Sequence, residues 1–214
     1  MQIFKFSILI VIYIIINRVD SQNIPTESTL DYHVEKFLAQ QQTKWRDMNI
    51  PAADGKILFD LIIQNKYTRA LEIGTSTGHS AIWMAWALSK TGGKLITIEI
   101  NENRYRKALH NFKEAGVDSF IDARLGDAHE LVPGLEGPFD FVFLDADKEW
   151  YLQYLKWLIP KMNPKGRFTA HNVLNTYMSG IPEFLDYLNK NKELETLILT
   201  SSSSGISVSY FKEK

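Results

Sequence analysis

The sequence contains no cysteine and no excess of basic residues. Without cysteine the chain can form neither disulfides nor a thiolate nucleophile, and it cannot build a cysteine-based zinc site. Its 24 Lys and Arg stand against 25 Asp and Glu, and no basic block is present that could follow a phosphate backbone. We therefore expect no nucleic-acid partner and predict small-molecule chemistry instead.

Long apolar runs are also scarce, and the notable one lies at the N-terminus. It extends from Phe6 to Ile16, follows Lys5 and precedes polar residues that include the small Ser21. The run is short for a bilayer span, and the pattern is typical of a signal peptide. Residues 1–21 are predicted to be a signal peptide or membrane-targeting leader. A cleaved leader would make the protein exported, whereas a retained one would leave it membrane-associated or cytoplasmic, with membrane contact through the leader alone.

Residues 22–214 are predicted to form a single domain with a helical segment (22–66) and an α/β core (67–214). In the core, short β-rich runs alternate with helical stretches, which indicates a parallel sheet covered on both faces. Two final runs, 194–200 and 206–211, flank a Ser-Gly turn and predict an antiparallel hairpin. The expected strands are 69–74, 94–100, 122–127, 139–147 and 166–172, and the expected helices are 29–48, a short one after Pro51, 79–90, 102–115, 148–159 and 180–189.

The first expected strand runs into a glycine loop, LEIGTSTGHSA, in which Gly74 and Gly78 flank small polar residues before a helix. Such glycines allow a sharp turn and close approach of a ligand to the helix N-terminus. The spacing is not the G-x-G-x-x-G of dinucleotide-binding proteins. Glu72 would also repel a pyrophosphate, whereas it would tolerate a ligand with a cationic, amino-acid-like portion. An oxidoreductase is therefore disfavoured.

Acidic residues follow the next two expected strands. Glu99 ends one of them, and a carboxylate there can accept hydrogen bonds from both hydroxyls of a ribose. Asp127 and Ala128 follow the other strand, where they could meet an adenine edge. Each feature alone also fits an ordinary strand-to-helix turn, but the three in this order indicate a nucleoside site.

The strand FDFVFLDADKEWY ends in Asp145, Asp147 and Lys148, at the edge where open parallel sheets bind ligands. Asp145 is a candidate metal ligand or substrate contact, and Lys148 is a candidate general base. Nearby carboxylates oppose deprotonation of a lysine, so a divalent cation or a desolvated pocket would have to offset them. The alternative is a solvated helix start with Asp147 as its N-cap.

The segments EIGTSTGHSA, GDA, FLDADKEWY and HN together resemble the cation-dependent class I O-methyltransferases, the family of caffeoyl-CoA and catechol O-methyltransferases. The resemblance implies a Rossmann-like sheet of seven strands, mostly parallel with a C-terminal antiparallel hairpin and helices on both faces. It also implies S-adenosylmethionine as methyl donor and a small hydroxylated acceptor, catechol- or phenol-like. It leaves a homodimer open. Trp150, Tyr151 and Tyr177 are candidates for an aromatic pocket or for core or lid packing.

The resemblance also assigns roles to single residues. Asp145 and Asn172 correspond to metal ligands, and Lys148 corresponds to the base of the catechol enzymes. The cofactor contacts that it implies are Ile50, Glu72, Gly74, Thr75, Ser80, Glu99, Ala128 and Asp147. Gly78 of the glycine loop and Asp127 of the GDA motif are further candidate cofactor contacts.

His171 departs from the family, which usually has a second aspartate before the asparagine. An imidazole suits zinc, iron, nickel or copper better than Mg²⁺ or Ca²⁺. Three readings stay open: His171 is a ligand in an altered metal site, it is itself the base of a metal-free site, or catalysis has been lost. The competing function is a non-catalytic nucleoside-binding or interaction module on the same fold.

Overall fold

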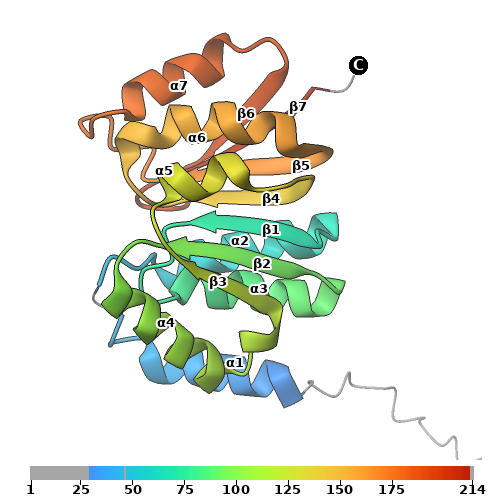
Figure 1. Ribbon diagram of the computed structural model, residues 1–214, viewed down its shortest axis with the longest axis vertical. Coiled ribbons are helices and arrows are strands. Elements are labelled where there is room, and N and C mark those ends of the chain that lie inside the picture. The colour runs from blue at the N-terminus through green and yellow to red at the C-terminus, as the bar shows by residue number, and fades with distance from the viewer. Residues whose placement is uncertain (1–28, 46, 213–214) are drawn as a thin grey trace, which may run out of the picture.

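A seven-stranded sheet forms the centre of the molecule, shown in Figure 1 as a computed structural model that describes residues 29–45 and 47–212. The strand order is β3-β2-β1-β4-β5-β7-β6, in which β7 runs antiparallel to both of its neighbours and the other pairs are parallel. The predicted fold class is thereby confirmed. The strands are β1 Arg69–Ile73, β2 Lys94–Glu99, β3 Ile121–Leu125, β4 Phe139–Leu144, β5 Met162–His171, β6 Leu194–Leu199 and β7 Ile206–Phe211.

Helices cover both faces of the sheet. One core gathers α1 to α4 and the other gathers α5 to α7, and successive residues of β1 alternate between them: Ala70 belongs to the first core, Leu71 and Ile73 to the second. Side chains of a strand point alternately to its two faces, so Glu72 faces α2 and α3 with Ala70. The helices are α1 Thr29–Gln41, α2 Ala52–Asn65, α3 His79–Thr91, α4 Glu102–Ala115, α5 Ala128–Leu131, α6 Tyr151–Leu158 and α7 Ile181–Lys190.

Several boundaries differ from the sequence-based expectation, and three of the differences bear on the site. The strand predicted to run to residue 147 ends at Leu144, because its partner β1 stops at Ile73 and turns away at the glycine loop. The strand predicted from residue 166 begins at Met162, and an irregular register between β4 and β5 accommodates the extra residues. The first helix ends at Gln41 instead of continuing to residue 48.

The segment between α1 and α2 lies against the glycine loop. The Asp47 carbonyl accepts a hydrogen bond from Ser76 Oγ at 2.6 Å, and Asn49 Nδ2 donates to Thr77 Oγ1 at 2.8 Å. These contacts need an extended connection, which is why the helix cannot continue there. They close one side of the crevice above β1 and β2.

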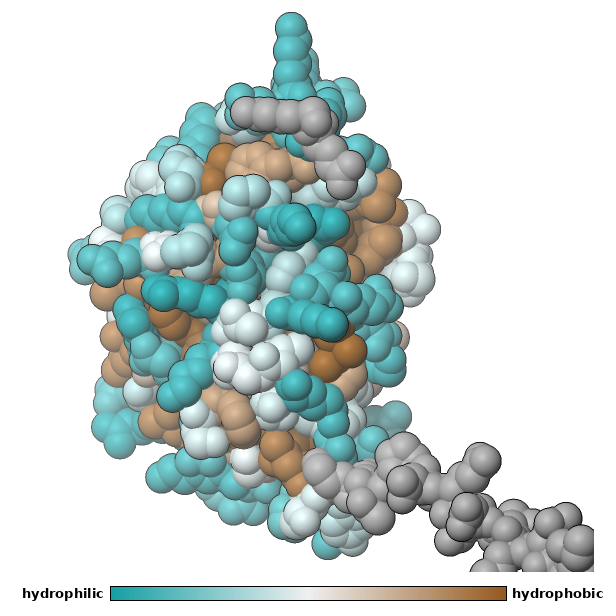
Figure 2. Space-filling view, turned by 90° about the vertical axis from the view of Figure 1, so that its right-hand side faces the viewer, coloured by the Kyte–Doolittle hydropathy of each residue, from teal (hydrophilic) through white to brown (hydrophobic). Residues whose placement is uncertain are grey.

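The predicted leader, residues 1–21, lies outside the described residues. In residues 29–45 and 47–212, none of the helices combines the length and apolar character needed to cross a membrane. The side of the molecule on which the parallel strands begin carries hydrophilic residues interspersed with hydrophobic ones (Figure 2). The polar residues singled out from the sequence lie at the opposite, carboxyl ends of the strands.

Candidate active site

A cavity of about 430 Å³ opens at the carboxyl ends of β1, β2 and β4. These strands flank the point where the chain order of the sheet reverses, which is where open α/β sheets bind ligands. Six of the predicted site residues contribute to its wall: Gly74, Glu99, Asp127, Ala128, Asp145 and Asp147. Four of the six are carboxylates, so the cavity suits hydroxyl, amino and cationic groups and repels phosphates.

Glu99 is held rigidly in this wall. Its Oε2 accepts a hydrogen bond from the Ser76 backbone N–H at 2.7 Å, and its Oε1 accepts one from the Asn101 N–H at 2.9 Å. The side chain is buried, with 6% of its residue surface exposed. Each carboxylate oxygen has more than one acceptor position, so both oxygens remain able to accept from a ligand in the cavity.

The far wall of the cavity is built around His129, a residue that the sequence reasoning missed. Asp127 caps the single turn α5 by accepting from the His129 N–H at 2.8 Å. His129 Nε2 lies 2.9 Å from Asp147 Oδ2, and the imidazole stacks on Trp150 with ring centroids 3.7 Å apart and planes at 21°. Asp147 also accepts from the Tyr154 hydroxyl at 3.1 Å. His129 directly follows the GDA motif, and this position is the sequence signal from which its place in the cavity wall could have been predicted.

Glu72 lies beneath the glycine loop and does not line the cavity. Ser80 Oγ donates to its Oε1 and Thr97 Oγ1 to its Oε2, both at 2.5 Å, and Thr97 is also hydrogen-bonded to Thr75. Burial raises the pKa of Glu72 to about 8, even though the hydrogen bonds from Ser80 and Thr97 favour the ionised form. The negative charges of Asp145 and Glu99 add to the increase.

Ile50 and Gly78 shape the loop without lining this cavity. The Ile50 carbonyl lies 2.8 Å from His79 Nδ1, and His79 Nε2 accepts from Trp83 Nε1 at 3.2 Å. Burial lowers the pKa of His79 to about 4, so the imidazole is neutral near pH 7 and its Nδ1–H donates to Ile50. Gly78 has φ +97°, and a Cβ there would lie 2.5 Å from the Phe112 ring.

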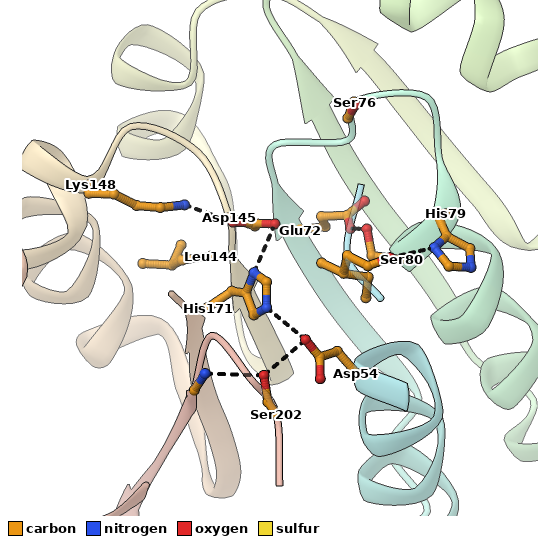
Figure 3. A network of polar contacts seen from close by, with 12 residues as sticks. Asp54, Glu72, Ser76, His79, Ser80, Leu144, Asp145, Lys148, His171 and Ser202 are labelled. Carbon is orange, nitrogen blue, oxygen red and sulfur yellow. Dashed lines mark hydrogen bonds and ion pairs between the residues drawn. The ribbon is translucent and has the colours of Figure 1, made fainter. Parts of the chain in front are cut away.

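The predicted acidic strand end joins a second, buried polar cluster (Figure 3). Lys148 Nζ donates to Asp145 Oδ1 at 2.7 Å, and His171 Nδ1 lies 3.3 Å from Asp145 Oδ2. On its other side, His171 Nε2 lies 2.8 Å from Oδ2 of Asp54 on α2, and Ser202 Oγ donates to the same oxygen at 2.9 Å. Five side chains from separate parts of the chain therefore form one connected cluster.

The charges of this cluster set the protonation of His171. Burial alone would lower the pKa of its imidazole, but Asp145 and Asp54 outweigh burial and raise the pKa above its ordinary value. A protonated imidazole cannot accept a proton, so this environment disfavours His171 as the base. Lys148, the other predicted base, is engaged as a donor to Asp145.

Two of the three predicted metal ligands, Asp145 and His171, adjoin each other. Across residues 29–45 and 47–212, no group of three or more histidine, aspartate or glutamate side chains is arranged to hold a metal ion. Asp145 Oδ1 faces Lys148 and His171 Nε2 faces Asp54, whereas His171 Nδ1 has no well-formed hydrogen bond. Asn172 adopts φ +63°, where the chain turns out of β5, and its carbonyl accepts from the Asn175 N–H at 3.1 Å.

The aromatic candidates have three different environments. Tyr151 is fully buried in the core, Trp150 packs beneath His129, and Tyr177 is fully exposed after β5. Core packing is therefore the role of Tyr151. Trp150 supports the cavity wall indirectly.

Comparison with known proteins identifies the family. A family model described as O-methyltransferase matches residues 25–182. The chain belongs to this O-methyltransferase family. Catechol O-methyltransferase of Niastella koreensis is 37% identical over 131 residues, which are 59% of this chain and 59% of that protein. Caffeoyl-CoA O-methyltransferase of Medicago sativa is 35% identical over 136 residues, 61% of this chain and 55% of that protein. The chain thus spans less than two thirds of the length of these relatives.

Solved structures of O-methyltransferases share the architecture of this family member. TomG of Streptomyces achromogenes, solved in complex with SAM, superposes with a TM-score of 0.73 at 26% identity, covering 86% of this chain and 91% of that one. The Bacillus cereus O-methyltransferase, in complex with SAH, gives a TM-score of 0.71 at 26% identity, covering 88% and 93%.

The close approach of Gly74 to the end of β4 yields a prediction about stability. Gly74 has φ +99°, and an added Cβ would lie 2.5 Å from the Asp145 carbonyl oxygen. Gly74→Ala is expected to lower the free energy of unfolding by about 2–4 kcal/mol, the sum of left-handed backbone strain and steric overlap. Urea denaturation measures the loss.

The matched control is Gly92→Ala, because Gly92 also has a left-handed φ, +77°, but nothing lies within 4 Å of an added Cβ. It should cost only the backbone strain, about 1 kcal/mol. Equal losses for the two variants would show that the contact with Asp145 carries no weight.

Proposed function

We propose that this family member is an S-adenosylmethionine-dependent O-methyltransferase that methylates a hydroxyl of a small aromatic acceptor. The names of its relatives and the SAM and SAH complexes of similar structures support this assignment. The observation that carries it is Glu99, a carboxylate fixed by two backbone amides in the wall of a cavity at the switch point of the sheet.

The cavity residues fit the chemical groups of this methyl donor. Glu99 would accept both ribose hydroxyls, which are vicinal donors. Ala128 and the polar pair of Asp127 and His129, all in the cavity wall, would meet the adenine edge. The donor carries a methyl group activated on a positively charged sulfonium, and the carboxylate of Asp145 in the cavity wall favours a positive charge nearby.

The acceptor side lies beyond the end of β5. The segment after His171 exposes Leu174, Tyr177 and Met178, whose exposed fractions are 45%, 100% and 37%. It is anchored to the β6–β7 turn, since the Leu174 N–H donates to the Ser204 carbonyl at 3.1 Å. Exposed apolar and aromatic side chains beside a polar cluster suit a planar phenolic acceptor, which has one apolar face and one hydroxyl edge.

The protein's part in the reaction is positioning and proton removal. Because the methyl group arrives activated, the chain has to align the acceptor oxygen and assist the loss of its proton. Asp145 lines the cavity and carries Lys148 and His171 behind it, so this carboxylate connects the donor cavity with the buried cluster.

Two measurements test the proposal together. Titration calorimetry should show one S-adenosylhomocysteine bound per chain, and mass spectrometry should detect methylated products from a panel of catechols and other phenols. Absence of binding would contradict the proposal outright. Binding without any methylated product would instead support the non-catalytic nucleoside-binding module.

A further inference from the structure

On the acceptor side of the site, charged side chains pair with one another at the place where the family resemblance predicts a divalent ion. Two carboxylates, Asp145 and Asp54, face two basic side chains, Lys148 and His171. The side chains of Lys148 and Asp145 are 11% and 13% exposed, and Asp54 and His171 are more deeply buried. Solvent screens such a cluster weakly, so the interactions among its own charges are stronger than their interactions with water and dissolved ions.

Of the two carboxylates that a hard cation could use, Asp145 is engaged by Lys148, and Asp54, whose Oδ1 is buried without a hydrogen bond, is outside the cavity wall. Mg²⁺ and Ca²⁺ require six or more oxygen ligands, mainly from carboxylates, carbonyls and water. Asp145 is the one carboxylate of the cluster in the cavity wall, and its Oδ1 accepts from the Lys148 ammonium at 2.7 Å. A divalent ion on Asp145 would have to share this carboxylate with the Lys148 ammonium.

The nitrogen and oxygen atoms of the cluster do not suit a softer cation such as Zn²⁺ any better. His171 Nε2 points to Asp54, which leaves Nδ1 as its remaining nitrogen. Nδ1 has no well-formed hydrogen bond and lies 3.3 Å from Asp145 Oδ2. One imidazole nitrogen and one shared carboxylate oxygen fall short of the three protein ligands of catalytic zinc sites.

The cluster is also braced from the opposite side. Ser202, on the turn between β6 and β7, donates to Asp54 and accepts from the Gly205 N–H at 3.1 Å. His171 is thereby fixed between α2 and the end of β4 by partners that do not depend on a ligand.

We propose that this methyltransferase uses no divalent metal ion, and that Lys148 and His171, held on Asp145 and braced by Asp54, take the place of the ion. The inference concerns the acceptor side of the proposed function and rests on it. Positive side chains beside Asp145 would stabilise the negative charge that develops on the acceptor oxygen as its hydroxyl passes its proton to the Asp145 carboxylate in the cavity wall.

Metal binding by the intact chain tests the proposal without relying on catalysis. Wild-type protein is treated with chelator, dialysed and titrated with Mn²⁺ by electron paramagnetic resonance and with Zn²⁺ by calorimetry. We expect no bound ion of either kind at the site, and methyl transfer that is unchanged by chelator. An ion bound by the wild type and lost in His171→Asn, or methyl transfer that chelator abolishes and metal restores, would overturn the proposal.

Two substitutions of His171 test whether this residue is what prevents a metal ion from binding. His171→Asp removes the imidazole and adds a carboxylate beside Asp145, so it should bind Mn²⁺ at least about 10-fold more tightly than the wild type. His171→Asn removes the imidazole without adding charge and should gain no such affinity. If His171→Asp gains no Mn²⁺ affinity, the role given to His171 is overturned.

S-adenosylhomocysteine calorimetry on the same samples keeps the two proposals separate. A chain that binds neither the nucleoside nor a metal refutes the proposed function. A chain that binds both the nucleoside and a metal refutes only the metal-free site.

Discussion

Glu99→Ala is expected to weaken the binding of S-adenosylhomocysteine by about 100-fold or more. Two hydrogen bonds from ribose hydroxyls to a carboxylate contribute about 1.5–3 kcal/mol each, and 1.4 kcal/mol corresponds to a tenfold change in affinity. The loss should be large because both oxygens of Glu99 are fixed by the amides of Ser76 and Asn101 before a ligand arrives. Titration calorimetry measures the dissociation constant directly.

Two further variants separate ligand binding from folding. Glu99→Gln retains one acceptor oxygen and should lose about tenfold in affinity. Glu102→Ala removes an exposed glutamate that pairs with Arg106 on the surface of α4, and it should leave the affinity unchanged. Affinity equal to that of the wild type in a folded Glu99→Ala protein would place the nucleoside elsewhere.

The fold could be predicted because its signals are local. Short apolar runs such as those around Leu71 and Val142 alternate with amphipathic helices, and each signal needs only a few neighbouring residues. Strand ends were predicted less well. β4 ends at Leu144 because β1, which pairs with it, has already stopped at Ile73, and a partner's length cannot be read from the strand itself.

The site could be predicted as far as it follows from the sheet. Glu99, Asp127 and Asp145 each follow a strand, and the carboxyl ends of neighbouring parallel strands meet at one edge, so their convergence was expected. Asp54 and Ser202 had no such signal. Their contacts join residues 117 and 148 positions apart, and no local pattern distinguishes them from ordinary surface residues.

Glu72→Gln is expected to stabilise the protein at neutral and alkaline pH. The pKa of Glu72 rises from 4.5 to about 8 on folding, because burial penalises its ionised form. Below pH 4.5 the carboxyl group is protonated in both states and has no effect. Between pH 4.5 and 8 the unfolded state releases the proton and the folded state retains it, so stability falls as pH rises.

Above pH 8 the full penalty applies, and the shift corresponds to about 5 kcal/mol. Glutamine cannot ionise, so the stability advantage of Glu72→Gln should be absent near pH 4, grow through pH 7 and reach its maximum near pH 9. Urea denaturation at these three pH values measures it, with the exposed Glu114→Gln on α4 as the control that should show no such trend. A constant difference between wild type and Glu72→Gln would mean that Glu72 does not titrate as a buried acid.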